Sequence, residues 1–436
     1  MTSSPSVPQR TSGNLTIDGG NFTLTRANMS GLTLLDGSTN QNLTIKNLKS
    51  TGDWNFSYEN APNSRWNILL DGTNNISASF EVLFRSDDST SSFTALPGST
   101  NTITGTAGTS GYGLLENYGI STFNNSTTTI NTIGGTAFFY GNQADKTREI
   151  NVINGGTLTI NAYSAIVSND VHDAGGLTDT SKISVNVTGT GSKLKATTSN
   201  VTFNAKVAAN KSDINLLASN GGVIEASTTV SGVNAFNGGK NPSIVADNGT
   251  ITLSSTGTSR VVNIYDRAGK IEAKNNGTIN INAGGTGTGV SVNRMAGYGY
   301  PTTDVVQIHS LTGGDINITN TNSGKGVQAS GDGMLNIISE DSGSTVAVTS
   351  VGSAIDSSSG ITGTEIAATN SGKITLTSSG ASTKTVTTTD TTNDTKISAL
   401  NGGQIEVNNN GSGDAVGMFI NNKPVNLTIQ GTNSLL

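Results

Sequence analysis

The chain has 436 residues, of which 33% are hydrophobic and only 5% aromatic, and 55 of them are glycine. So few large side chains argue against an ordinary globular helical domain. The 24 Lys and Arg residues against 30 Asp and Glu residues give a net charge of -6 at pH 7. The sequence contains no stripe of basic residues that could neutralise a row of phosphates, so we expect no nucleic-acid partner. Because there is no cysteine, neither a disulfide framework nor a thiolate metal site is available. The sequence also contains no P-loop and no dinucleotide-binding motif, and we expect no metal and no cofactor.

Residues 1–13 have the character of a tag or a linker. They lack the apolar core of a secretion signal, and no stretch of the chain approaches the ~20 apolar residues of a membrane span, so we expect no membrane insertion. The richness in Asn, Thr and Gly is typical of an extracellular protein, and the missing cysteines favour a Gram-positive surface. We therefore expect a fragment of a longer exported protein, attached to the cell wall through parts that this chain lacks.

Residues 14–140 are predicted to form an N-terminal cap and the first, irregular coils of a solenoid. Short alternating runs such as Leu15-Thr-Ile17 indicate half-buried strands from the start. Most of the large aromatic residues lie in this part of the chain, four of them in 53–72, and we interpret them as a cap, because an open strand edge invites pairing with other chains. The alternative is that an exposed Trp54 or Trp66 stacks on a sugar ring.

Residues 141–436 are predicted to form regular coils, because one unit recurs through them. An Ile-led strand is followed by a turn of Asn, Ser or Gly and then by a second strand that begins with Ile or Leu. The two strand starts are eight residues apart at 150 and 158, 271 and 279, 308 and 316, 366 and 374, and 397 and 405. The spacing is one residue shorter from Ile244 to Ile251 and two longer from Ile214 to Ile224.

The turn residues and the repeat length together predict the fold class. Asn154-Gly155-Gly156 and Asn275-Asn276-Gly277 offer residues that tolerate positive φ, as a sharp corner or a hairpin requires. The unit recurs at 150, 183, 214, 244 and 271, and periods of about 20–50 residues are typical of stacked repeats rather than of hairpins. We therefore predict an all-β, right-handed parallel β-helix, a single-stranded solenoid. Asparagines such as Asn275 and 408–410 are candidates for side-chain amide ladders between coils.

Three stretches of the sequence carry a family resemblance. The opening segment 14–24, the segment Trp66-Asn-Ile-Leu-Leu-Asp-Gly72 and the Asn-Gly-Gly corners resemble the pectate-lyase-like adhesive domains of large surface proteins of lactic-acid bacteria. The resemblance covers nearly the whole chain after residue 13. It implies an N-terminal binding region on a long stalk at the bacterial cell surface, in contact with host mucin, extracellular matrix, polysaccharide or neighbouring bacteria. Autotransporter passengers and phage tailspikes share this composition.

The sequence contains no convincing catalytic set. A polysaccharide lyase needs an Arg or Lys base beside carboxylates that hold Ca²⁺. The densest polar cluster is Asp170-Val-His-Asp173, which we interpret as a surface loop rather than as such a site. The best candidate for ligand binding is the loop 292–304, in which Arg294 suits an anionic group and Tyr298 and Tyr300 suit sugar rings. Tyr265 and Arg267 form a second candidate.

The leading functional hypothesis is a cell-surface adhesin that binds host or bacterial glycans or glycoproteins without catalysis. The enzymatic alternative is a Ca²⁺-dependent lyase acting on uronate-containing polymers, with a site assembled from residues distant in sequence. The third hypothesis is a spacer, or a self-associating module that binds the same protein on neighbouring cells and causes aggregation.

Overall fold

A computed structural model describes most of the chain. The described residues are 13–20, 22–25, 41–51, 66–78, 84–85, 90–105, 113–116, 118–141, 147–169, 182–205, 213–229, 235–238, 241–265, 268–293, 305–331, 333–359, 361–381, 383–390, 393–412, 416–420 and 425–436. Among them there is no helix; the strands form three parallel sheets, which make a parallel β-solenoid, as predicted. The chain divides into two compact units, residues 1–212 and 213–436.

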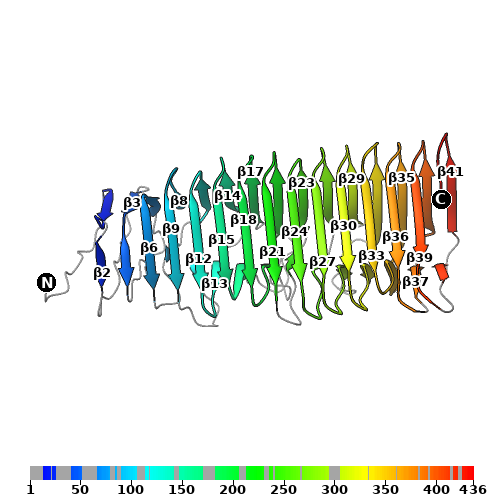
Figure 1. The fold of residues 1–436 in the computed structure, drawn as a ribbon, viewed down its shortest axis with the longest axis horizontal. Helices are drawn as coiled ribbons and strands as arrows, with labels where there is room; N and C mark the ends of the chain where they lie inside the picture. Colours follow the sequence, from blue (N-terminus) through cyan, green and yellow to red (C-terminus); the bar gives the residue numbers. More distant parts are fainter. Residues whose placement is uncertain are drawn as a thin grey trace. The chain divides into compact units, whose positions relative to one another are not determined.

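The first unit contributes strands to all three sheets (Figure 1). Its first sheet consists of β1 (Leu15–Asp18), β3 (Gln41–Lys46), β5 (Trp66–Asp71), β8 (Ser92–Ala95), β11 (Ile120–Asn124), β14 (Thr147–Ile153) and β17 (Lys182–Thr188). The second consists of β2 (Thr23–Thr25), β4 (Lys49–Thr51), β6 (Thr73–Ala78), β9 (Thr100–Gly105), β12 (Thr127–Thr132), β15 (Thr157–Ala162) and β18 (Lys193–Thr198). The third consists of β7 (Phe84–Arg85), β10 (Gly113–Glu116), β13 (Thr136–Gly141), β16 (Ser164–Asn169) and β19 (Phe203–Ala205).

The second unit repeats the same order of strands. Its first sheet consists of β20 (Asp213–Ser219), β23 (Ser243–Asp247), β26 (Gly269–Lys274), β29 (Val305–Leu311), β32 (Met334–Glu340), β35 (Gly363–Thr369), β38 (Thr395–Leu400) and β41 (Val425–Gln430). The second consists of β21 (Val223–Thr228), β24 (Thr250–Ser255), β27 (Thr278–Ala283), β30 (Asp315–Asn320), β33 (Thr345–Ser350), β36 (Lys373–Ser378) and β39 (Gln404–Asn409). The third consists of β22 (Phe236–Gly238), β25 (Val262–Tyr265), β28 (Val290–Asn293), β31 (Val327–Ser330), β34 (Ile355–Ser359), β37 (Lys384–Thr388) and β40 (Val416–Ile420).

The core of the second unit is built from in-register rows of aliphatic side chains. Strand residues alternate between a buried and a more exposed face, as a half-buried strand requires. In the first sheet, one row joins Ile244, Ile271, Ile308, Ile337, Ile366 and Ile397. In the second sheet, another joins Ile224, Ile251, Ile279, Ile316, Val346, Ile374 and Ile405. All of these side chains are at most 1% exposed, so the recurring Ile residues of the sequence are the core.

The corners between the first and second sheets have the conformation that their sequences predict. Asn275 and Asn276 have φ of 52° and 61°, and Asn154 and Gly155 have φ of 54° and 79°. Asparagine and glycine adopt this left-handed region at little cost. The parallel pairing of β26 with β29, and of β27 with β30, shows that these corners are turns of a solenoid and not hairpins.

At two places, the observed strand register differs by two residues from the register that the repeat predicted. Ile183 lies beside Arg148, whereas Ile150 lies beside Val185. Similarly, Leu216, and not Ile214, is the partner of Ile244. Because side chains of a strand alternate with a period of two, this slip left each residue on the correct face. Counted from Leu216, the offset to Ile224 is eight residues, as elsewhere.

Side-chain amide ladders connect successive turns, at asparagines other than those named from the sequence. Asparagine Nδ2 groups donate to asparagine Oδ1 atoms of the neighbouring turn at 2.8–3.3 Å in the pairs 67 and 42, 74 and 101, 154 and 124, 161 and 131, 186 and 151, 263 and 237, 317 and 280, and 401 and 370. Asn275 instead donates to Asp247 at 2.7 Å, and Asn408 donates to Glu406 at 2.9 Å. Nearby carboxylates therefore replace the amide partner at these two predicted positions.

Aromatic side chains fill the interior of the first unit. Phe93 lies 5.5 Å from Phe84, 6.0 Å from Tyr118 and 6.2 Å from Phe123, measured between ring centroids, and Phe123 meets Phe138 edge to face at 6.3 Å. These tilted geometries are favourable for aromatic pairs. The predicted aromatic cap is only partly visible, because of the aromatics in 53–72 only Trp66 lies among the described residues.

Candidate binding site

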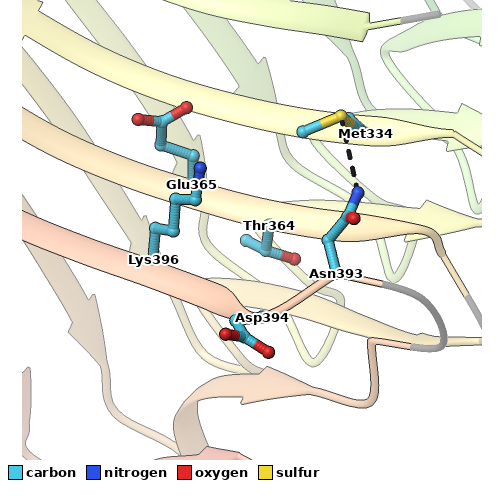
Figure 2. Close-up of a pocket in the computed structure, with 6 residues that line it drawn as sticks. All are labelled: Met334, Thr364, Glu365, Asn393, Asp394 and Lys396. Atoms are coloured by element: carbon cyan, nitrogen blue, oxygen red, sulfur yellow. Dashed lines mark hydrogen bonds between the residues drawn. The ribbon is translucent and has the colours of Figure 1, made fainter. Parts of the chain in front are cut away.

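An open cavity of about 360 Å³ lies in the second unit, where three strands of the first sheet begin. Its lining comes from β32, β35 and β38 and from the two residues before β38 (Figure 2). The lining residues are Met334, Thr364, Glu365, Asn393, Asp394 and Lys396.

Strand alternation and one glycine shape this cavity. Met334 lies beside Gly363 across the β32–β35 pair. Gly363 has no side chain, which lets Asn393 pack closely against it: a Cβ atom at this position would stand 3.0 Å from the Cβ of Asn393. The Asn393 amide points toward Met334, with Nδ2 4.0 Å from the sulfur (Figure 2). The cavity therefore has one apolar wall, formed by a thioether.

The opposite wall is charged. Glu365 and Lys396 are direct neighbours in the β35–β38 pair and both face outward. Neither forms an ion pair with another described residue within 4.0 Å. Asp394 accepts a hydrogen bond from the Asn426 side chain at 3.0 Å. Two carboxylates and one ammonium group therefore border the opening and give it a net negative charge.

A buried carboxyl group lies behind the lining. Asp390 is 0% exposed and accepts hydrogen bonds from the Thr364 backbone N–H at 3.1 Å, the Thr364 hydroxyl at 2.9 Å and the Thr395 hydroxyl at 2.5 Å. Burial raises the pKa of Asp390, and the hydrogen bonds from Thr395 and Thr364 offset part of this rise. This network fixes Thr364 and the start of β38, so Asp390 positions the cavity lining without bordering the opening.

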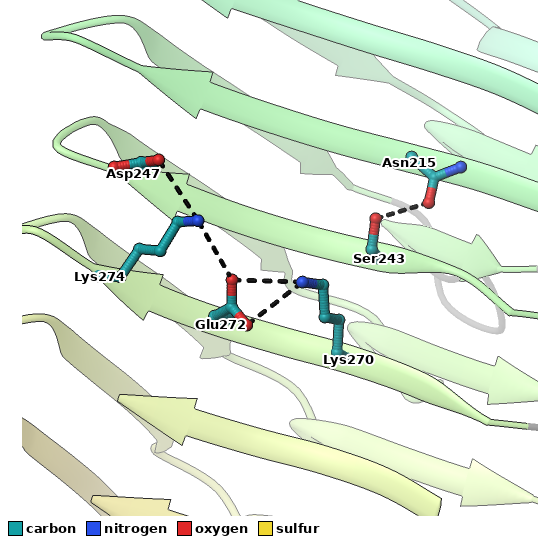
Figure 3. A network of polar contacts seen from close by, with 6 residues as sticks. All are labelled: Asn215, Ser243, Asp247, Lys270, Glu272 and Lys274. Carbon is teal, nitrogen blue, oxygen red and sulfur yellow. Dashed lines mark hydrogen bonds and ion pairs between the residues drawn. The ribbon is translucent and has the colours of Figure 1, made fainter. Parts of the chain in front are cut away.

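A second polar region lies on the outer face of the first sheet (Figure 3). Lys274 lies 3.4 Å from Asp247 and 3.7 Å from Glu272, and Lys270 lies 3.2 Å from Glu272. One turn away, the Ser243 hydroxyl donates to Asn215 at 2.5 Å. The four charges neutralise one another across neighbouring strands, which suits a solvated outer face.

The predicted ligand-binding residues are only partly placed. Trp54, Arg267, Arg294, Tyr298 and Tyr300 lie outside the described residues, as does the cluster 170–173. Tyr265 ends β25, but its side chain is not among those described. Trp66 is 3% exposed on β5 and contributes to the core, so its placement does not suit stacking on a sugar.

Sequence reasoning missed the residues that line the cavity. They come from three turns of the solenoid, and no motif connects 334, 364–365 and 393–396 along the chain. The available signal was the repeat itself, since Ile337, Ile366 and Ile397 belong to one row and each follows a lining segment. Val305, the residue that follows the predicted loop 292–304 in the sequence, lies beside Met334.

No group of three or more His, Cys, Asp or Glu residues arranged to hold a metal ion is found within the described ranges. No helix long and apolar enough to cross a membrane is found among the same residues. Comparisons with models of protein families, with curated proteins and with solved structures give no match.

Proposed function

We propose that this protein is a binding region of a bacterial cell-surface adhesin, which recognises glycans or glycoproteins without turning them over. The supporting observation is the open cavity at the starts of β32, β35 and β38. Its volume of about 360 Å³ is within the usual range of about 300–1,000 Å³ for ligand pockets. The partners proposed are sugars of host mucin, extracellular matrix or bacterial polysaccharide, met at the outer surface of the cell.

The lining offers the groups that a sugar ring requires. Hydroxyl groups both donate and accept hydrogen bonds, and the carboxylates of Glu365 and Asp394, the amide of Asn393 and the ammonium group of Lys396 complement them. The C–H face of a pyranose is apolar and suits the polarisable thioether of Met334. Several hydroxyl contacts at one opening provide specificity for a polyhydroxylated ligand.

The charge of the opening favours neutral glycans over uronates. Two carboxylates face one ammonium group, so an additional carboxylate on the ligand is repelled. This charge balance also distinguishes the proposal from a lyase, in which the uronate carboxylate must be neutralised before a proton is removed.

A glycan array tests the proposal, with Glu365→Gln as the site variant and Glu406→Gln as the matched control. Glu406 lies on β39 in the second sheet and pairs with Lys373 at 3.2 Å, away from the cavity lining. We expect the wild type to retain a set of neutral glycans, Glu365→Gln to bind them about tenfold more weakly, and Glu406→Gln to bind them like the wild type. Equal binding by both variants would place recognition elsewhere.

The same preparation should be incubated with pectins and other uronates plus Ca²⁺. We expect no unsaturated product. Steady product formation that an acidic-residue substitution abolishes would identify a lyase and overturn the proposal.

A further inference from the structure

Ile133 and Tyr163 are exposed at equivalent places in neighbouring turns of the first unit. Each is the first residue after its strand, β12 or β15, and these strands pair in register up to Asn131 and Asn161. Ile133 is 73% exposed and Tyr163 is 37% exposed, whereas Tyr118 of the same unit is 3% exposed and belongs to the core. Ile133 and Tyr163 therefore give the ends of β12 and β15 an exposed apolar surface, which we call the apolar step.

The outer face of the second sheet beside this step carries hydroxyl and amide groups. β6, β9, β12 and β15 lie side by side (Figure 1), and every outward residue of these strands is Thr, Ser or Asn. The outward row nearest to the step consists of Ser77, Thr104, Asn131 and Asn161. The hydroxyl groups of Ser77 and Thr104 form no hydrogen bond with another described residue, so they are available to a ligand.

The asparagine pair of this row connects the hydroxyl groups to the apolar step. The Asn161 Nδ2 group donates to the Asn131 Oδ1 atom at 2.9 Å, at the exposed surface. Both asparagines lie two positions before a residue of the step, and this spacing places side chains on one face of a sheet. The bond leaves the Asn131 Nδ2 group as a donor and the Asn161 Oδ1 atom as an acceptor. One donor and one acceptor held side by side complement two neighbouring hydroxyl groups of a sugar.

The outward residues of β6, β9, β12 and β15 carry no charge, unlike those of other strands in the same sheet. On the next strand, β18, the outward rows continue with Lys193 and Lys195. In the second unit, outward residues of this sheet include Glu225, Asp315 and Lys373. The face beside the apolar step therefore suits a neutral ligand and offers no ion pair to an anionic one.

We propose that this face and the apolar step form a second binding site, which holds a linear, neutral glycan across the four strands. The ring of Tyr163 packs on the apolar C–H face of one sugar, Ile133 extends this contact, and the row from Ser77 to Asn161 binds hydroxyl groups along the chain. At ~4.8 Å per strand spacing, the row is about 14 Å long, which exceeds a single sugar ring. The site therefore recognises segments of a polymer.

A protein partner fits this face less well than a glycan does. Specific protein interfaces bury about 800 Å² on each partner and have an apolar centre. The apolar step supplies only two side chains, and hydroxyl and amide groups cover the strands beside it. A polyhydroxylated ligand uses both features.

Affinity gel electrophoresis of the full chain tests the proposal, with dextran, mannan or hydroxyethylcellulose in the gel. We expect at least one of these neutral polymers to retard the wild type, and we expect polygalacturonate not to retard it. Tyr163→Ala should weaken binding of the retarding polymer about tenfold, whereas Tyr163→Phe should preserve it, because the ring is retained. Ile120→Ala is the matched control: it removes a side chain that is 46% exposed on β11 of the first sheet, and it should bind like the wild type.

A second pair of variants places a charge on the sheet. Thr129→Lys puts a long charged side chain in the middle of the proposed face and should weaken binding at least as much as Tyr163→Ala. Thr252→Lys makes the same change at an outward, half-buried threonine on β24 of the second unit, and should leave binding unchanged. Circular dichroism checks that both variants fold, and if Thr129→Lys does not, the Tyr163 variants decide.

The length of the ligand provides a further readout. Oligosaccharides cut from the retarding polymer should compete with it more strongly as they lengthen, until they cover the row from β6 to β15. Competition by a monosaccharide as strong as that by the longest oligosaccharide would overturn the proposal of an extended site.

Three results with the polymers would also overturn it. They are no retardation of the wild type by any of the three neutral polymers, equal retardation of Tyr163→Ala and the wild type, and equal losses in Thr129→Lys and Thr252→Lys.

This inference rests on the proposed glycan-binding function, but it concerns a different site from the cavity at β32, β35 and β38. Glu365→Gln separates the two. Weaker binding by Glu365→Gln together with unchanged binding by Tyr163→Ala would remove this inference alone, whereas the reverse pattern would support it and remove the cavity. A wild type that binds no glycan in the array and no polymer in the gel would remove both.

Discussion

The carbonyl oxygen of Ala368 occupies the place where a Cβ atom would stand at Gly403. Ala368 belongs to β35 and Gly403 to the corner after β38, so this contact joins one turn of the solenoid to the next. Ala246 and Gly277 have the same relationship. Neither glycine has a positive φ, which means that close approach of the backbone, and not conformational freedom, requires glycine here.

We predict that Gly403→Ala lowers the melting temperature. The added methyl group must displace the backbone of the neighbouring turn, a kind of overpacking that costs about 1–3 kcal/mol. Gly284→Ala is the matched control, because its Cβ atom would meet the nearest atom, the Ser255 carbonyl oxygen, at an ordinary 3.6 Å. Differential scanning calorimetry checks the prediction, and equal melting temperatures for the two variants would refute the role of close approach.

The buried amide ladder of the first unit gives a second prediction. Asn101 accepts from Asn74 at 2.9 Å and donates to Ser99 at 3.0 Å and to Thr128 at 3.2 Å, and both asparagines are at most 2% exposed. Asn101→Ala leaves these buried partners without their bonds, which costs about 1–3 kcal/mol. Asn161→Ala should cost much less, because its bond to Asn131 lies at the exposed surface. Urea unfolding of both variants measures the difference, and similar losses would show that ladder burial does not matter.

Features that depend on residues close together in the sequence are predictable here, whereas features that depend on the pairing of distant strands are not. The corner at 275–277 and the buried isoleucines follow from local rules, namely residues that tolerate positive φ and a period of two along strands. The exact register does not, since Ile183 and Arg148 differ in type and yet lie side by side. Either of two alternating positions satisfies the same pattern, and only the pairing of whole strands selects between them.

Local sequence patterns did not predict the candidate site, because its residues come together only when distant strands pair. Gly363 appears as one more loop glycine in the sequence, and its role emerges only when Met334 and Asn393 are brought to either side of it by neighbouring turns. Trp66 shows the opposite case, a residue that the sequence singled out but that the structure does not place at a site. Trp66 stood out by its type and was a candidate for sugar stacking, but its position on β5 buries it.

Asp390 gives a prediction for the dependence of stability on pH. Burial raises the pKa of this carboxyl group above its ordinary value of 3.8, so the folded chain binds the proton more tightly than the unfolded chain does. The resulting stabilisation is fully present below the unfolded-state pKa and is lost as the pH rises through the raised folded-state pKa. Asp390→Asn cannot titrate and should lack this loss.

The measurement is the free energy of urea unfolding for wild type and Asp390→Asn at a series of pH values from below 3.8 upward. The difference between them should shift in favour of the variant as the pH rises, and then stay constant once Asp390 is ionised in both states. Parallel curves over the whole range would contradict the assignment of a raised pKa to Asp390.

The central claim is that glycans bind in the cavity beside Gly363, and isothermal titration with an array-selected neutral glycan tests it most directly. Gly363→Val should push against Asn393, whose Cβ atom would stand 3.0 Å from the new Cβ atom, and so displace one lining residue without altering any charged group of the lining. We predict that the wild type binds and that Gly363→Val loses at least about tenfold in affinity, while its circular dichroism spectrum stays that of the wild type. Unchanged affinity in a folded Gly363→Val variant would contradict the claim.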